Sequence, residues 1–196
     1  IALCEAIGAL HAMQPPLLYL DCKPSNIMTD GEGGVWLVDF GSTLESWDAQ
    51  TEPVAGSIGY AAPEQFGILT EEEPVFAQED GAKRGRKADV RSDVFGLGRT
   101  LYALLSGMDP SKPPYAACPL RDCNPEIPRK LEKIVERCMQ KSPSERFGTM
   151  EAVKGALQGF LEEHAKGGWK RKMLPWGTWL LLGAACGTAW RFYQAV

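Results

Sequence analysis

The sequence has no excess of positive charge, few histidines and no cysteine spacing of the kind that binds metals. Its 196 residues carry a net charge of −4, which gives no electrostatic basis for nucleic acid as a partner. It holds two histidines and six cysteines, without a C-x-x-C spacing. Only Cys118 and Cys123 lie close together. We therefore predict that all six cysteines are reduced, with a metal site as the less favoured alternative.

The first residues lack the features of a natural start. The chain begins at Ile1, inside an apolar pattern, with no initiator Met and no signal peptide. We expect a fragment that begins inside a domain. The apolar content of 44% and the charged content of 23% are typical of a folded protein, and the length allows one core with an appendage.

The most informative stretch is residues 19–41. It contains four polar residues of the types that handle a hydroxyl, a phosphate and Mg²⁺, namely Asp21, Lys23, Asn26 and Asp39. Apolar runs at 17–19, 27–28 and 35–38 flank them and predict short strands joined by loops. Alternatively, D-x-K-P-S-N is an Asx-type turn and D-F-G a strand end followed by a turn glycine.

The ordered set Y-L-D-x-K-P-S-N followed by D-F-G resembles the catalytic core of the protein kinases, in its serine/threonine form. The resemblance implies that Asp21 accepts the substrate hydroxyl proton and that Lys23 neutralises the transferred phosphate. It implies ATP as cofactor, with Lys23, Asn26 and Asp39 in its site. It also implies that Asn26 and Asp39 hold Mg²⁺, with Mn²⁺ as an alternative metal.

The catalytic loop departs from the family pattern at two positions. Tyr19 replaces the usual His, which is a mild change. Leu20 replaces the usual Arg, which in the family pairs with a phosphate on the activation segment. Leucine cannot form that pair. Two hypotheses follow: activity does not need phosphorylation of this segment, or the enzyme is weakened.

Residues 39–64 resemble the activation segment, which opens with Phe40 and Gly41 after Asp39 and closes with A-P-E. Ser57 stands where the family usually has Thr, and its hydroxyl can bridge the catalytic Asp and Lys. The resemblance also pairs Glu64 with a buried arginine, Arg146, with a surface arginine as the alternative. It directs Asp93 back to the catalytic loop, from the start of the central helix.

Helical spacing of apolar residues predicts four amphipathic helices. They lie at about residues 1–13, from an N-cap at Ser92 to an end at Gly107, at 131–139 and from 150 to about 164. We read 70–91 as an exposed charged insertion, and the six prolines of 108–128 as an extended connection with at most a short helical turn. The predicted fold class is α+β, mostly α. It resembles the C-terminal lobe of a kinase, with small β-loops at the site.

The resemblance covers about residues 1–164, as part of a kinase domain. No G-x-G-x-x-G run and no V-A-I-K-like strand occurs, so the small lobe is not represented and we expect the fragment alone to bind ATP weakly. Residues 165–172 form a basic linker. Residues 173–190 carry no charge and predict a single transmembrane helix, with 191–196 as a short tail. The alternative is a hydrophobic helix docked on a soluble partner.

The sequence is thus interpreted as a membrane-anchored serine/threonine protein kinase of a bacterial, clostridial-like type, with the kinase domain in the cytoplasm. Its partners would be protein substrates with Ser or Thr hydroxyls and the membrane, while a homodimer remains open. A pseudokinase that keeps the fold as a binding or scaffold module is the alternative.

Overall fold

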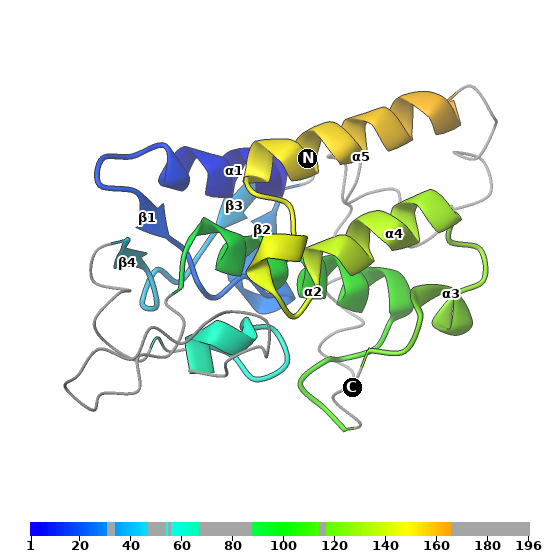
Figure 1. Ribbon diagram of the computed structural model, residues 1–196, viewed down its shortest axis with the longest axis horizontal. Helices are drawn as coiled ribbons and strands as arrows, with labels where there is room; N and C mark the ends of the chain where they lie inside the picture. The colour runs from blue at the N-terminus through cyan, green and yellow to red at the C-terminus, as the bar shows by residue number, and fades with distance from the viewer. Residues whose placement is uncertain (31–33, 47–53, 55, 67–87, 114–116, 166–196) are drawn as a thin grey trace.

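The computed structural model describes residues 1–30, 34–46, 54, 56–66, 88–113 and 117–165. These residues form a helical body with two small antiparallel sheets at its edge (Figure 1). The helices are α1 (Ala2–His11), α2 (Val90–Ser106), α3 (Leu120–Cys123), α4 (Arg129–Cys138) and α5 (Met150–Ala165). The strands are β1 (Leu17–Leu18), β2 (Ile27–Thr29), β3 (Val35–Leu37) and β4 (Leu44–Glu45). The predicted α+β, mostly α class is confirmed for this part of the chain.

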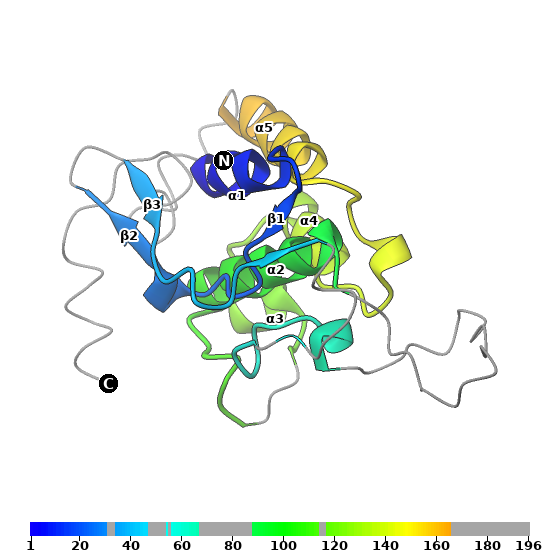
Figure 2. The same ribbon diagram turned by 90° about the vertical axis from the view of Figure 1, so that its left-hand side faces the viewer.

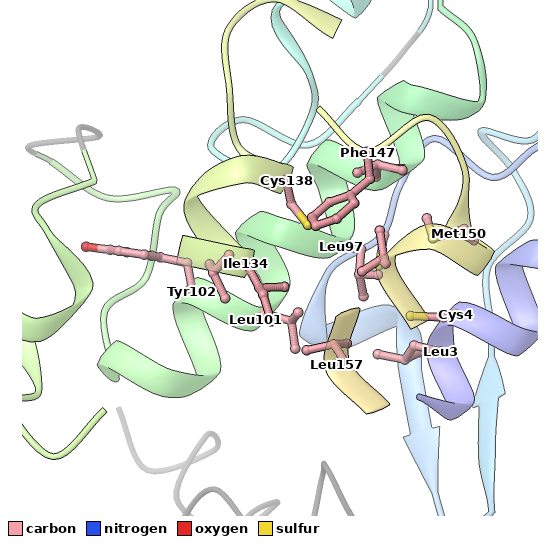
Figure 3. Packing of buried hydrophobic residues seen from close by; sticks show 14 of the residues in the cluster. Leu3, Cys4, Leu97, Leu101, Tyr102, Ile134, Cys138, Phe147, Met150 and Leu157 are labelled. Atoms are coloured by element: carbon pink, nitrogen blue, oxygen red, sulfur yellow. The ribbon is translucent and has the colours of Figure 1, made fainter. Parts of the chain in front are cut away.

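Helix α2 lies in the middle of the body (Figure 2). It packs against α4, while α1 packs against α5. Side chains from these four helices converge in one apolar core, including Leu3, Leu97, Ile134 and Leu157 (Figure 3). Burial of this apolar surface is the main force that fixes the helices against one another.

Helix α2 begins three residues earlier than the sequence predicted. Its N-cap is Asp89, whose carboxylate accepts a hydrogen bond from the backbone N–H of Arg91 at 2.7 Å. Ser92 is the third helical residue, and its Oγ accepts from the Asp89 N–H at 3.3 Å to complete a capping box. The prediction of Ser92 as N-cap is therefore wrong. The end at Gly107 is confirmed, with φ at 73° in the left-handed region.

The two sheets hold the predicted short strands. β2 pairs with β3 in antiparallel register, with Met28 opposite Trp36. β1 pairs with β4, with Leu18 opposite Leu44, and β4 was not predicted. Because a two-residue strand carries no periodic pattern, only its partner defines it.

The described cysteines divide into two groups, while Cys186, also predicted to be reduced, lies outside the described residues. Cys4, Cys22 and Cys138 are free thiols buried in the core. Burial raises the pKa of Cys22 and of Cys138 to about 12, so both stay protonated and inert. Cys118 and Cys123 are instead joined in a disulfide. The prediction of reduced cysteines is therefore wrong for this pair, because α3 returns Cys123, its last residue, to Cys118, which lies two residues before the helix.

Two further predictions fall on residues outside the described ranges. Residues 67–87 make up most of the charged insertion, and residues 166–196 contain the basic linker and the predicted membrane helix. Within the part of the chain that the structure describes, no helix has both the length and the apolarity to cross a membrane.

Candidate active site

Asp21 is held by two neighbours on the loop between β1 and β2. Lys23 Nζ lies 2.8 Å from Asp21 Oδ2, and Asn26 Nδ2 donates to the same oxygen at 2.9 Å. A 3₁₀ turn at Pro24–Asn26 returns the chain so that Asn26 reaches back to Asp21. The other carboxylate oxygen, Oδ1, is buried and has no hydrogen-bond partner among the described residues. A buried acceptor without a donor is costly, so this oxygen is poised to accept from a ligand.

The charge state of Asp21 follows from this environment. Burial raises the pKa of Asp21, but the Ser57 hydroxyl and the Lys23 ammonium beside it outweigh burial, and the pKa lies below its usual value. Asp21 is thus an anion at neutral pH, with one oxygen anchored and the other open to a proton donor.

The hairpin of β2 and β3 brings Asn26 and Asp39 together. The backbone N–H of Val38 donates to the carbonyl of Asn26 at 2.9 Å, so Asp39 follows directly beside Asn26. Asp39 has a positive φ of 62° and an exposed side chain, whose Oδ1 accepts the Gly41 N–H at 3.1 Å. Since the amide nitrogen of Asn26 is used on Asp21, its oxygen faces away as an acceptor. An amide oxygen and an exposed carboxylate are ligands that suit Mg²⁺.

Tyr19 ties the catalytic loop to Phe40. Its hydroxyl donates to the carbonyl of Val38 at 2.6 Å, and its ring lies edge-on to Phe40 with centroids 5.5 Å apart. Burial, and after it the nearby Cys22 and Asp21, raise the pKa of Tyr19, so the hydroxyl remains a donor. Tyrosine at this position therefore supports the segment that carries Asp39.

Asp93 clamps the start of the loop from α2, as predicted. Its carboxylate accepts the backbone N–H of Tyr19 at 2.9 Å and of Leu20 at 2.6 Å. The His11 Nε2 lies 2.8 Å from Asp93 Oδ2. The side chain of Asp93 is fully buried.

Three polar side chains that the sequence did not single out also hold the loop. Besides His11, the Gln65 amide donates to the Leu20 carbonyl at 3.0 Å, and the Thr100 hydroxyl donates to the Cys22 carbonyl at 2.9 Å. They come from α1, a turn after the activation segment and α2. No spacing pattern connects these three elements, so no signal in the sequence indicates these residues.

The predicted anchors of the activation segment are also in place. Lys23 Nζ donates to Ser57 Oγ at 2.6 Å and lies 2.8 Å from Asp21 Oδ2, so the segment is linked to both predicted catalytic residues. Glu64 forms a two-pronged ion pair with Arg146, at 2.6 and 2.9 Å, and both side chains are at least 98% buried, with exposed fractions of 2% and 0%. Ser92 Oγ donates to Glu64 Oε1 at 2.7 Å.

The family model of the protein kinase domain matches residues 1–157, in agreement with this geometry. The chain belongs to the protein kinase family. Among curated relatives of this kinase domain, tyrosine-protein kinase MasK of Myxococcus xanthus is 32% identical over 77% of the chain. Serine/threonine-protein kinase PrkC of Bacillus subtilis is 30% identical over 76%, and probable serine/threonine-protein kinase PknB of Corynebacterium glutamicum is 29% identical over 84%.

The matched segments cover 23%, 22% and 26% of these three relatives, in the same order, so the chain spans about a quarter of their length. Relatives from unrelated bacteria match to a similar degree. The clostridial type therefore remains a prediction.

In this kinase domain, Leu20 takes part in an apolar cluster. Its side chain is 3% exposed and packs with Leu18 of β1, Val54 of the activation segment and Ala88 before α2. Its φ of 65° turns the loop at this point. At the position where the family pattern places a phosphate-binding arginine, this kinase domain therefore has apolar packing against its own activation segment.

Gly59 brings the activation segment against the start of the 108–128 connection. Its φ is 86°, and a Cβ there would overlap the Pro110 carbonyl. We expect Gly59→Ala to lower the free energy of unfolding by more than Gly107→Ala. The Gly107 site has a similar φ of 73° but open space around a Cβ, so it carries only the left-handed strain of about 1–2 kcal/mol. Equal losses in denaturant titrations of the two variants would contradict the contact with Pro110.

Proposed function

We propose that this domain belongs to a serine/threonine protein kinase, which transfers the γ-phosphoryl group of ATP to Ser or Thr hydroxyls of proteins. The observation that carries the proposal is the Oδ1 of Asp21, which has no hydrogen-bond partner among the described residues and is an acceptor beside the Lys23 ammonium. The family match and the relatives named serine/threonine-protein kinases support it.

In this proposal each of the four residues has its own role in phosphoryl transfer. Asp21 orients the substrate hydroxyl and accepts its proton at Oδ1, while Lys23 places a positive charge where the transferred group becomes more negative. Asn26 and Asp39 would hold Mg²⁺, which neutralises phosphate charge when it is bound. Asp93 fixes the geometry of the loop, which lowers the entropic cost of aligning these groups for the reaction.

The choice of Ser/Thr over Tyr rests on Lys23. Lysine two residues after the catalytic Asp is the serine/threonine form of the loop, and its bond to Ser57 places the activation segment close to Asp21. The relative named as a tyrosine kinase makes tyrosine the competing acceptor to be tested.

The test is phosphate transfer from labelled ATP by the full-length protein, with an equimolar mixture of peptides that differ only in Ser, Thr or Tyr at one position. We expect label on Ser and Thr peptides, and its loss when EDTA removes Mg²⁺. Label on the Tyr peptide alone would contradict the acceptor class. Absence of label on all peptides, with nucleotide bound, would instead support a pseudokinase.

We further propose that the protein acts at the membrane through residues 173–190, with the kinase domain on the cytoplasmic side. The support is the uncharged run of 18 residues after a basic cluster in the sequence. We expect the full-length protein to sediment with membranes and to resist extraction by high salt and alkali. Release of the protein by salt alone would rule out a spanning helix.

The apolar cluster around Leu20 supports activity without phosphorylation of the activation segment. We expect Leu20→Arg to lower the free energy of unfolding by about 2–3 kcal/mol, because it buries a charge without a partner. Leu20→Met is the matched control and should cost less than about 1.5 kcal/mol. Denaturant titration measures both.

A phosphosite between Ser42 and Ser57 that is essential for activity would contradict this view of the segment. Mass spectrometry of the active full-length protein, with Ala at each hydroxyl in that interval, decides the point.

A further inference from the structure

Three sulfur atoms meet on the surface between α2 and α3. We call Met108, Cys118 and Cys123 the sulfur cluster. The Sδ of Met108 lies 3.8 Å from the Sγ of Cys118 and 3.4 Å from the Sγ of Cys123, which form the disulfide. The Tyr102 hydroxyl contacts the pair as well, at 3.3 Å from Cys118 and 3.7 Å from Cys123.

The cluster differs from the other described cysteines in access. Cys4, Cys22 and Cys138 are at most 2% exposed, whereas Cys118 and Cys123 are partly exposed and Met108 is 37% exposed. A cavity of about 180 Å³ opens beside Cys118, lined also by Tyr102 and Met139. Reaction of a disulfide requires access for an attacking thiolate, so among the described cysteines only this pair is open to exchange.

One line of contacts joins the sulfur cluster to the activation segment through α2. The Tyr102 hydroxyl touches both cysteine sulfurs, and the Arg99 guanidinium lies over the Tyr102 ring, with Cζ 5.7 Å from its centroid. Arg99 Nε in turn donates to the Gly59 carbonyl at 2.5 Å. Gly59 lies two residues after Ser57, which binds Lys23.

A second line runs along the backbone. Met108 lies two residues before Pro110, whose carbonyl is packed so closely against Gly59 that no Cβ would fit between them. The backbone thus connects Met108 directly to the contact of Pro110 with Gly59. Both lines end on the same residue of the activation segment.

We propose that Cys118 and Cys123 form a reversible thiol–disulfide site whose state is transmitted to the activation segment at Gly59. The oxidant is a small-molecule disulfide. One cysteine thiolate attacks it and releases one small thiol, and the second cysteine then displaces the other small thiol, so two protein thiols become one disulfide while the reagent gains two electrons. A dithiol reductant reverses the exchange. Regulation of protein phosphorylation by this site rests on the proposed kinase function, but the site itself does not.

The first experiment measures the chemistry on the full-length protein. Free thiols are alkylated under native conditions before and after treatment with dithiothreitol, and again after oxidised glutathione is added. We expect the Cys118–Cys123 peptides to change from blocked to alkylated and back, while the Cys4, Cys22 and Cys138 peptides react only after denaturation. A pair that never forms, or one that resists native reduction, would overturn the proposal.

The second experiment measures transmission, by hydrogen exchange of the peptide that spans residues 56–66. We expect its exchange rates to differ at least about fivefold between reduced and oxidised protein, the lower end of usual coupling between sites. The Cys118→Ser/Cys123→Ser variant should show no such difference, and Tyr102→Phe should form the disulfide with a smaller difference. Equal exchange in both redox states of the wild type would overturn the coupling, whether or not phosphate transfer is observed.

Discussion

Replacing Asp21 by Asn should reduce the turnover number for phosphate transfer by at least about 100-fold, the lower end of what a positioned base supplies. The amide preserves the shape of the side chain and its contact with Asn26. It removes the negative charge, and with it the acceptor that Oδ1 offers to a substrate hydroxyl. Labelled-ATP assays on the full-length protein measure the change, with circular dichroism to confirm the fold.

The matched control is Glu163→Gln, the same carboxylate-to-amide change on an exposed side chain of α5. It should leave turnover unchanged. The pH profile adds an independent check. Since the pKa of Asp21 is lowered, its anion is present throughout the neutral range, and turnover should fall only in acid, as the carboxylate is protonated. A variant Asp21→Asn with undiminished turnover would remove Asp21 from the chemistry.

Breaking the pair of Glu64 and Arg146 should produce the largest loss of stability. Arg146→Met leaves the Glu64 carboxylate buried with Ser92 as its one remaining side-chain donor among the described residues, and such an uncompensated charge costs about 3–5 kcal/mol. This is a large part of the total stability of a typical domain, about 5–15 kcal/mol. Urea titration of the full-length protein, followed by near-ultraviolet circular dichroism, measures the loss.

Two further variants separate the contribution of the ion pair to stability from that of its surroundings. The double variant Glu64→Leu/Arg146→Met should lose less than Arg146→Met alone, because no charge is left buried. Lys130→Met removes a pair with the exposed Glu163, 2.5 Å apart, and should cost no more than about 1 kcal/mol. A loss for Arg146→Met as small as that for Lys130→Met would mean that the buried pair adds nothing.

The sequence predicted the parts of the site whose residues follow one another at short spacing. Asp21, Lys23 and Asn26 share one loop, and the structure places their side chains in contact. Their catalytic roles remain predictions. The long-range partners Glu64 and Arg146 were predictable only through the family resemblance, because nothing in their local sequence states which arginine reaches which glutamate. The buried faces of the helices were predictable because the apolar residues recur at the spacing of one helix face.

The features that the sequence did not predict depend mainly on contacts between residues that the fold brings together. The bond of His11 to Asp93 joins α1 to α2, and the pairing of β1 with β4 joins two strands of two residues each. The disulfide of Cys118 and Cys123 depends on how the α3 turn folds the connection back. The shift of the N-cap from Ser92 to Asp89 has a different cause, since two residues of good capping type lie three positions apart and the earlier one caps the helix, with Ser92 completing the capping box.

The clamp of Asp93 on the catalytic loop has a consequence for biosynthesis. Leu20 and Asp93 are 73 residues apart, and at usual elongation rates the ribosome adds Asp93 about 4–15 s after Leu20. Until then, the backbone N–H groups of Tyr19 and Leu20 lack the acceptor that sets their conformation. The nascent chain therefore contains Asp21 and Lys23 for seconds before Asp93 can fix the loop that carries them.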